Sequence, residues 1–109
     1  MTVASDVVME TGGFMVGRNR WLCIAASWGF GVLEISRDRL VLDTTWTRYT
    51  LTHQSIVRLS TSGLLFSPGV RFQHSVAAYP RFLAFTTFKI GRVLQRLREA
   101  GYAVDGAKA

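Results

Sequence analysis

Cysteine is almost absent from this chain of 109 residues, and its scarcity limits the chemistry open to the protein. The single cysteine, Cys23, lies in the apolar run WLCIAAS, so no intrachain disulfide can form and a cysteine-based zinc site would lack its other ligands. No neighbouring residue supplies a base, and we therefore interpret Cys23 as a small buried hydrophobe. A chain without disulfides fits a reducing, cytoplasmic location.

Histidines and carboxylates are also few, and they follow no pattern typical of an enzyme. A metal site would need both histidines, His53 and His74, together with Asp43 or Glu34, and their spacing matches no known ligand motif. The sequence has no Gly-x-Ser-x-Gly nucleophile motif, no paired carboxylates and no G-x-G-x-x-G fingerprint. We therefore expect a protein that is not an enzyme and holds no metal and no cofactor.

Long hydrophobic runs are missing too. The longest uncharged apolar stretch, Trp21–Leu33, has thirteen residues and contains two glycines. A helix that spans a membrane needs about 20 residues, so we expect no transmembrane segment. Asp6 and Glu10 stand where a signal peptide would carry basic residues. We expect residues 1–12 to form a flexible leader instead.

Apolar and basic residues are plentiful. Hydrophobic residues make up 49% of the chain and charged residues 18%, a composition that favours a folded domain over a disordered segment. The length fits one domain, which we place at residues 13–104, followed by a flexible tail at 105–109. Thirteen Lys and Arg against seven Asp and Glu give a formal charge of +6, which permits an anionic partner. The bases are scattered singly, so nucleic acid is not the expected partner.

Alternation of apolar and polar residues predicts seven short antiparallel strands. They are Arg20–Ser27, Val32–Ser36, Leu40–Thr44, 47–53, Ser55–Ser60, Val70–Val76 and 81–87. The stretches SWGFG and TSGLLFSPG read as loops between strands. Val57 and Leu59 share one side of the fifth strand. In the sixth, His74 falls on the inner side with Val70 and Phe72, where we expect it half-buried with a ring nitrogen hydrogen-bonded.

The last segment changes to a helical period. Its apolar residues recur at i, i+3, i+4 and i+7 and predict an amphipathic helix; they are Ile90, Val93, Leu94 and Leu97. Thr86 or Thr87 can cap the start of this helix, and Gly101 stands where a glycine commonly ends one. The economical arrangement is a mainly β fold, a strongly bent sheet or partly open barrel capped by the C-terminal α-helix.

Five stretches in order, ASWGFGVLEISRDRLVL, YTLTHQSIVRLS, GVRFQHSV, YPRFLAF and VLQRLREAGY, cover most of Ala26–Tyr102. Together they resemble small uncharacterised bacterial proteins with the pleckstrin-homology-like (PH-like) fold. The resemblance implies seven antiparallel strands capped by a C-terminal helix, and a binding or scaffold module without enzymatic chemistry. PH domains that bind inositol phosphates carry several bases in the loop that matches SWGFG, which has none here, so that specificity is not carried over.

Two sets of residues are candidates for an interaction surface. Aromatic residues in the predicted loops can contact a protein partner or another copy of the chain, or fold back over the barrel; they are Trp28, Phe30 and Phe66. Basic residues on the outer helix face, with a base nearby in sequence, can meet an anionic ligand or stay solvated; they are Lys89, Arg92, Arg96 and Arg81. We expect protein–protein interaction or self-association, through a strand edge or the aromatic residues. The alternative is peripheral, weak binding of anionic lipid headgroups by the helix face and the aromatic loop.

Overall fold

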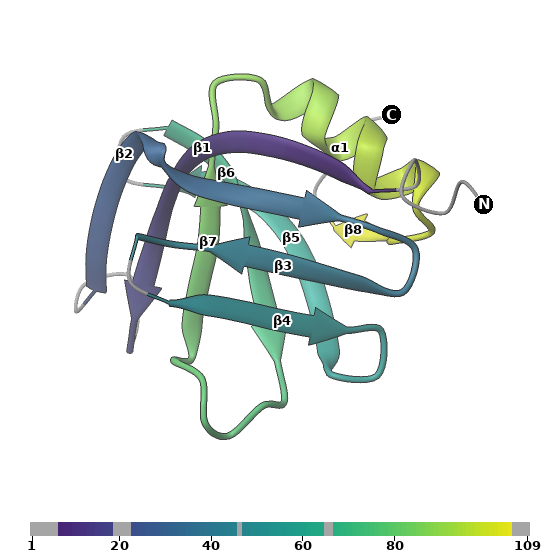
Figure 1. Cartoon of the computed structure of the whole chain (residues 1–109), viewed down its shortest axis with the longest axis horizontal. Helices are drawn as coiled ribbons and strands as arrows, with labels where there is room; N and C mark the ends of the chain where they lie inside the picture. Colours follow the sequence, from purple (N-terminus) through teal and green to yellow (C-terminus); the bar gives the residue numbers. More distant parts are fainter. Residues whose placement is uncertain (1–6, 19–22, 46, 65–66, 106–109) are drawn as a thin grey trace.

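The computed structural model describes residues 7–18, 23–45, 47–64 and 67–105 of the chain. Its elements follow one another along the sequence as strands, one helix and a final short strand (Figure 1). They are β1 (Val8–Gly17), β2 (Cys23–Ile35), β3 (Arg39–Asp43), β4 (Arg48–Thr52), β5 (Ile56–Leu64), β6 (Ser67–His74), β7 (Phe82–Thr86), α1 (Ile90–Glu99) and β8 (Val104–Asp105). The expected mainly β fold with one C-terminal helix is confirmed.

The strands form one open sheet in the order β4-β3-β2-β1-β7-β6-β5-β8. It has eight strands and is mixed, so the expectation of seven antiparallel strands is wrong in number and in direction. Two observed strands, β1 and β8, were not predicted, whereas the first two predicted strands form one strand, β2. Of the two, β8 pairs parallel to β5 through Leu59 and Val104. Gly101 takes a positive φ of 94° after the helix, which turns the chain back toward the edge of β5. Asp105, expected in the tail, therefore belongs to the sheet.

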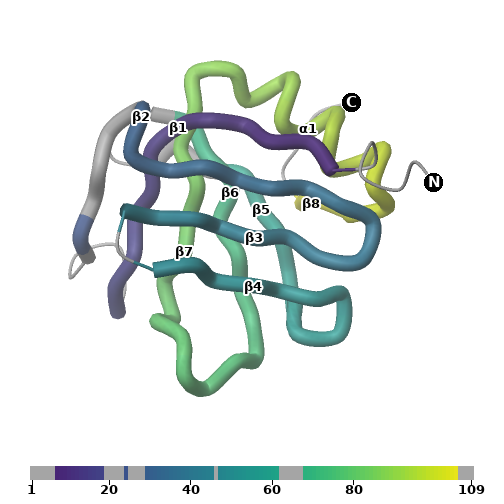
Figure 2. Tube along the Cα trace, viewed as in Figure 1, coloured from purple at the N-terminus to yellow at the C-terminus, as the bar shows by residue number. Residues whose placement is uncertain are grey.

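Residues 8–12, expected to lie in a leader outside the domain, are part of β1. This strand pairs with β2 on one side and with β7 on the other. Figure 2 shows it crossing the molecule between these neighbours. Glu10 lies in this segment, and its side chain is buried and paired with Arg92 of the helix. A buried carboxylate that depends on a partner 82 positions away leaves no local signal in the sequence.

The stretch SWGFG is not a loop but the bend of one long strand, β2. The β1–β2 register jumps from Gly12 opposite Gly31 to Phe14 opposite Ala26, so β2 carries extra residues at the bend. Gly29 supplies a positive φ of 100° there. At Gly12 a Cβ atom would meet the Thr86 carbonyl oxygen and the Phe85 ring, so only glycine allows the strands to approach this closely.

The second expected loop, TSGLLFSPG, is also mostly strand, because β5 continues to Leu64 and β6 begins at Ser67. At the other end of β5 the register shifts between Ile56 and Arg58. This bulge leaves Val57 70% exposed while Leu59 is buried, so the expectation that both share one side is wrong.

The concave side of the bent sheet holds one hydrophobic core. It is built from every strand from β1 to β7 and from the helix; its largest fully buried side chains include Phe14, Leu33, Leu42, Leu51, Phe72, Phe85 and Leu97. In α1 the residues Val93, Leu94 and Leu97 are buried, as the period predicts, and burying each contributes about 1.5–3 kcal/mol. The first helical position follows Lys89, which makes no side-chain cap; Thr87 instead accepts a hydrogen bond from the Lys89 N–H.

The end of the helix is anchored to the β2–β3 turn by Tyr102. Its hydroxyl donates to the Ser36 carbonyl oxygen at 2.9 Å, and its ring stacks on His53 with centroids 4.2 Å apart. The His53 ring also bonds through Nε2 to the Arg37 carbonyl oxygen. Burial, with a smaller contribution from the negative charge of Asp38, raises the pKa of Tyr102 to about 12.

Replacing Tyr102 with phenylalanine should remove one high-pH transition from the ultraviolet titration of the three tyrosines. The folded state favours the neutral phenol of Tyr102, and this preference adds to the free energy of unfolding. The contribution is complete below pH 10 and is lost as the pH rises toward about 12. At neutral pH the same substitution removes one hydrogen bond, worth about 1 kcal/mol in urea unfolding. A transition near pH 12 that survives in Tyr102→Phe would contradict the assignment.

Candidate functional site

The basic helix face does not form a free stripe. Arg92 donates from Nε and from a terminal nitrogen to the buried carboxylate of Glu10, at 3.1 and 2.8 Å. Arg96 lies 3.7 Å from Glu99 in the same helix. Only Lys89 of the three expected helix bases has no ion-pair partner in the described residues. Arg92 is therefore a structural residue, and the helix offers less free charge than its sequence indicates.

The aromatic candidates are only partly described. Phe30 is exposed at the bend of β2, at 56% of its surface, so it is not a lid over the core. The Trp28 side chain and the whole of Phe66 lie outside the described residues. Sequence reasoning missed Phe88, which is 75% exposed directly before Lys89.

The described carboxylates are all used in ion pairs. The pairs are Glu10 with Arg92, Glu34 and Asp43 with Arg48, Asp38 with Arg39, Glu99 with Arg96 and Asp105 with Arg58. The described bases outside this set are Arg18, Arg37, Arg71, Arg81, Lys89 and Arg98. Within the described part of the chain, the positive charge that no carboxylate balances therefore lies on these six side chains.

Arg71 and Arg81 line the same groove at the end of the sheet opposite the helix. The groove measures about 490 Å³ and runs along β6 and the β6–β7 loop; its walls are Arg71, Gln73, His74, Ser75, Val76, Ala77, Tyr79 and Arg81. No carboxylate is among these walls. Sequence reasoning placed Arg81 with the helix bases, but β7 separates Arg81 from the helix (Figure 1).

Arg71 on β6 packs against the neighbouring strand β7. On β6 it alternates with the buried residues Val70 and Phe72, so its side chain stands on the outer face of the sheet. Its Cζ lies 5.0 Å from the centroid of the Phe82 ring, next in sequence to Arg81. Its Nε is buried without a hydrogen-bond partner in the described structure, a deficit that costs about 1–3 kcal/mol.

The β6–β7 loop is fastened by His74, whose expected half-buried, hydrogen-bonded position is confirmed. Nδ1 accepts from the Val76 N–H at 3.1 Å, which leaves Nε2 to donate to the Pro80 carbonyl oxygen at 2.7 Å. With both ring nitrogens engaged, His74 shapes the loop and is not available as a base or a metal ligand.

Tyr79 ties the same loop to the edge strand β4. Its hydroxyl accepts from the Thr50 N–H at 3.2 Å, and its ring meets Tyr49 edge-on with centroids 5.2 Å apart. Ser55 accepts from the Thr52 N–H at 2.8 Å. Two outward N–H groups of β4 are therefore occupied, which leaves this edge less able to pair with a second copy than an open strand.

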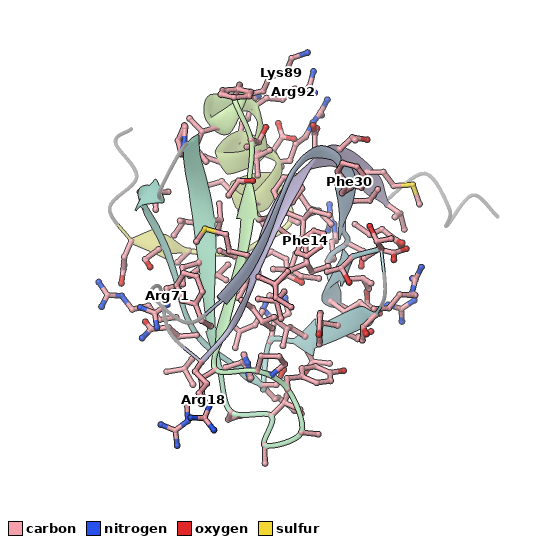
Figure 3. All side chains as sticks on the ribbon, turned by 90° about the vertical axis from the view of Figure 1, so that its left-hand side faces the viewer. Phe14, Arg18, Phe30, Arg71, Lys89 and Arg92 are labelled. Atoms are coloured by element: carbon pink, nitrogen blue, oxygen red, sulfur yellow. The ribbon has the colours of Figure 1, made fainter. Side chains whose placement is uncertain are left out.

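Arg18 adds positive charge at this end. It directly follows Gly17, which is paired with Phe82 of β7, so it stands at the same end of the β1–β7 pair as Arg81. Figure 3 shows Arg18 at the lower end of the molecule below Arg71, whereas Lys89 and Arg92 lie at the upper end. Arg18 and Arg71 therefore lie far from Lys89, toward the opposite end of the molecule.

The residues that line the groove can bind a ligand through several polar groups. Within the described residues no three His, Cys, Asp or Glu side chains gather as a metal site would require. Among those residues no helix is long and apolar enough to cross a membrane. The groove offers guanidinium groups, an amide and hydroxyls, which together can hold an anion.

Comparison with known proteins adds no relative: no family model, no curated protein and no solved structure matches this chain.

Loss of the Arg92 side-chain charge should weaken the fold rather than a binding site. The variant Arg92→Gln leaves the buried Glu10 carboxylate without its ion pair, and we expect a loss of about 2 kcal/mol in urea unfolding, less than for a fully buried pair because Arg92 is half-exposed. Arg98→Gln, an exposed and unpaired control on the same helix, should stay within about 0.5 kcal/mol of the parent. Equal unfolding midpoints for the two variants would contradict a structural role for Arg92.

Proposed function

We propose that the protein is a non-enzymatic, PH-like binding module that works in the cytoplasm by protein–protein interaction. Its partner presents an acidic peptide segment to the groove between β6 and the β6–β7 loop. The observation that carries this proposal is that Arg71 and Arg81 line one groove and neither has an ion-pair partner among the described residues. The described carboxylates all pair with other arginines.

Charge complementarity favours an acidic partner over a neutral one. Arginine binds carboxylates through two parallel hydrogen bonds, and such bonds are stronger than those between neutral groups. The groove also has apolar walls at Val76 and Ala77, which suit the small side chains that flank an acidic residue in a peptide. The order of seven strands followed by a helix and one short strand is consistent with the PH-like assignment, and the single cysteine with the cytoplasm.

A second copy of the chain is a less suitable partner for the groove than an acidic peptide of another protein. A second copy carries the same net charge of +6, and the described carboxylates it could offer are already in ion pairs. The occupied N–H groups of Thr50 and Thr52 also reduce pairing through the β4 edge. We therefore place the partner in another protein.

Binding of a fluorescent acidic peptide, followed by anisotropy at low and at physiological salt, tests the proposal. Arg71→Gln and Arg81→Gln should each weaken binding by about tenfold, since each removes one charge-assisted contact. Arg98→Gln keeps the same net charge as these variants and should bind like the parent. No binding at low salt, or equal losses in all three variants, would overturn the proposal.

The second candidate function is weak binding to anionic membranes, and one observation favours it. Phe88, 75% exposed, directly precedes Lys89, which has no ion-pair partner among the described residues, at the start of the helix. An exposed aromatic ring beside a free base is typical of a side chain that enters the headgroup region. Arg92 and Arg96 pair with carboxylates and therefore add little to the attraction for an anionic membrane.

Co-sedimentation with vesicles of an anionic phospholipid separates this candidate from the peptide proposal. If the membrane is the partner, Phe88→Ser and Lys89→Gln should reduce the bound fraction by several-fold, since one base contributes about 1 kcal/mol near such a surface. Arg81→Gln is the matched control and should leave vesicle binding almost unchanged. Absence of sedimentation at low salt would exclude the membrane candidate.

A further inference from the structure

The geometry of Arg71 sets it apart from an ordinary surface arginine. The ring of Phe82 supports the guanidinium on one face, and Nε is buried without an acceptor, while other parts of the side chain line the groove. A cation that is partly removed from water is screened less and attracts an anion more strongly. The planar group is therefore oriented before any ligand arrives, which reduces the entropy lost on binding.

The charge in the groove exceeds what one carboxylate can neutralise. Arg71 and Arg81 bring two positive charges, and the described lining residues contain no acid. A carboxylate carries one negative charge and two acceptor oxygens. A phosphate monoester carries about 1.5 to 2 negative charges at neutral pH and three acceptor oxygens, so it can serve both guanidinium groups at once.

Neutral donors beside the arginines also match a group with several acceptors. The Gln73 amide lines the groove and has no hydrogen-bond partner within the described part of the chain. Tyr79 lines the same groove, and its hydroxyl accepts from the Thr50 N–H of β4. His74 and Tyr79 hold the loop in position, so these donors need little rearrangement.

We infer that the groove selects a phosphorylated side chain, with Arg71 as the residue that distinguishes the phosphate from a carboxylate. This inference rests on the proposed peptide-binding function and names the chemistry of the peptide that binds best. The ligand is a phosphate monoester displayed on an acidic segment of a partner protein.

Three peptides of one sequence, with serine, glutamate or phosphoserine at the central position, test the inference by isothermal titration calorimetry. We expect phosphoserine to bind about tenfold more tightly than glutamate, and serine to bind weakest. The advantage of phosphoserine should grow between pH 5 and pH 7, because the second phosphate ionisation lies near pH 6. Inorganic phosphate should compete with the phosphoserine peptide for the same site.

The variant Arg71→Lys keeps the charge and loses the planar fork, so the phosphoserine advantage should fall to about twofold while glutamate still binds. Arg98→Lys, the matched control, should keep the advantage. Equal affinities for phosphoserine and glutamate in the parent protein, independent of pH, would overturn this inference and leave the proposed function standing. Failure of both acidic peptides to bind would overturn the proposed function as well.

Discussion

Pairing of β1 along both of its edges is the interaction on which the rest of the structure depends. β2, β3 and β4 form one run of neighbours in the sheet, β7, β6 and β5 the other, and β1 alone joins them. β1 also passes very close to β7, where only a glycine at position 12 fits beside Thr86 and Phe85. The helix contacts the same strand through the ion pair between Arg92 of α1 and Glu10 of β1. This pair therefore links α1 directly to β1.

Ion pairs separate the described charged surface residues into those that are paired and those that are free. Each described carboxylate lies close to an arginine, so the negative charge of the described residues is balanced locally, and the remaining bases keep their positive charge. The unpaired bases in the described part of the chain include Arg71 and Arg81 beside the β6–β7 loop, and Lys89 directly before the helix. Net charge alone would not have located either place, because the same excess spread evenly would attract anions only weakly.

Periodicity was sufficient for the parts of the fold that alternate locally. It identified β3, β4, β6, β7 and the buried face of α1, because the apolar pattern of each lies within its own segment; β3 and β7 are buried on both faces. It missed β1 and β8, whose pairing depends on distant partners, and it divided β2 at a glycine-rich bend that the sheet tolerates. Propensity marks SWGFG as a turn, and only the partner strand shows that it is a bend inside one.

The candidate site, like the fold, could be predicted from the sequence only where the signal is local. Alternation in GVRFQHSV places Arg71 and Gln73 opposite the buried Val70 and Phe72, so their outward position could be predicted. Their meeting with Arg81 could not, because it depends on the path of the loop that His74 fastens. The spacing of the basic helix face was predicted correctly. The sequence did not show that Arg92 is engaged by a carboxylate of β1, Glu10.

The position of Tyr79 has one more consequence. A sheet that ends in free amide groups can be lengthened by any extended chain, including misfolded copies of itself, and basic proteins of this size meet many such chains. Here the loop that walls the groove also covers Thr50 on the outermost long strand, while the opposite border is closed by the two residues of β8. Lengthening the sheet at β4 would first require this hydrogen bond to break, so the loop protects the protein against aggregation whether or not its groove is filled.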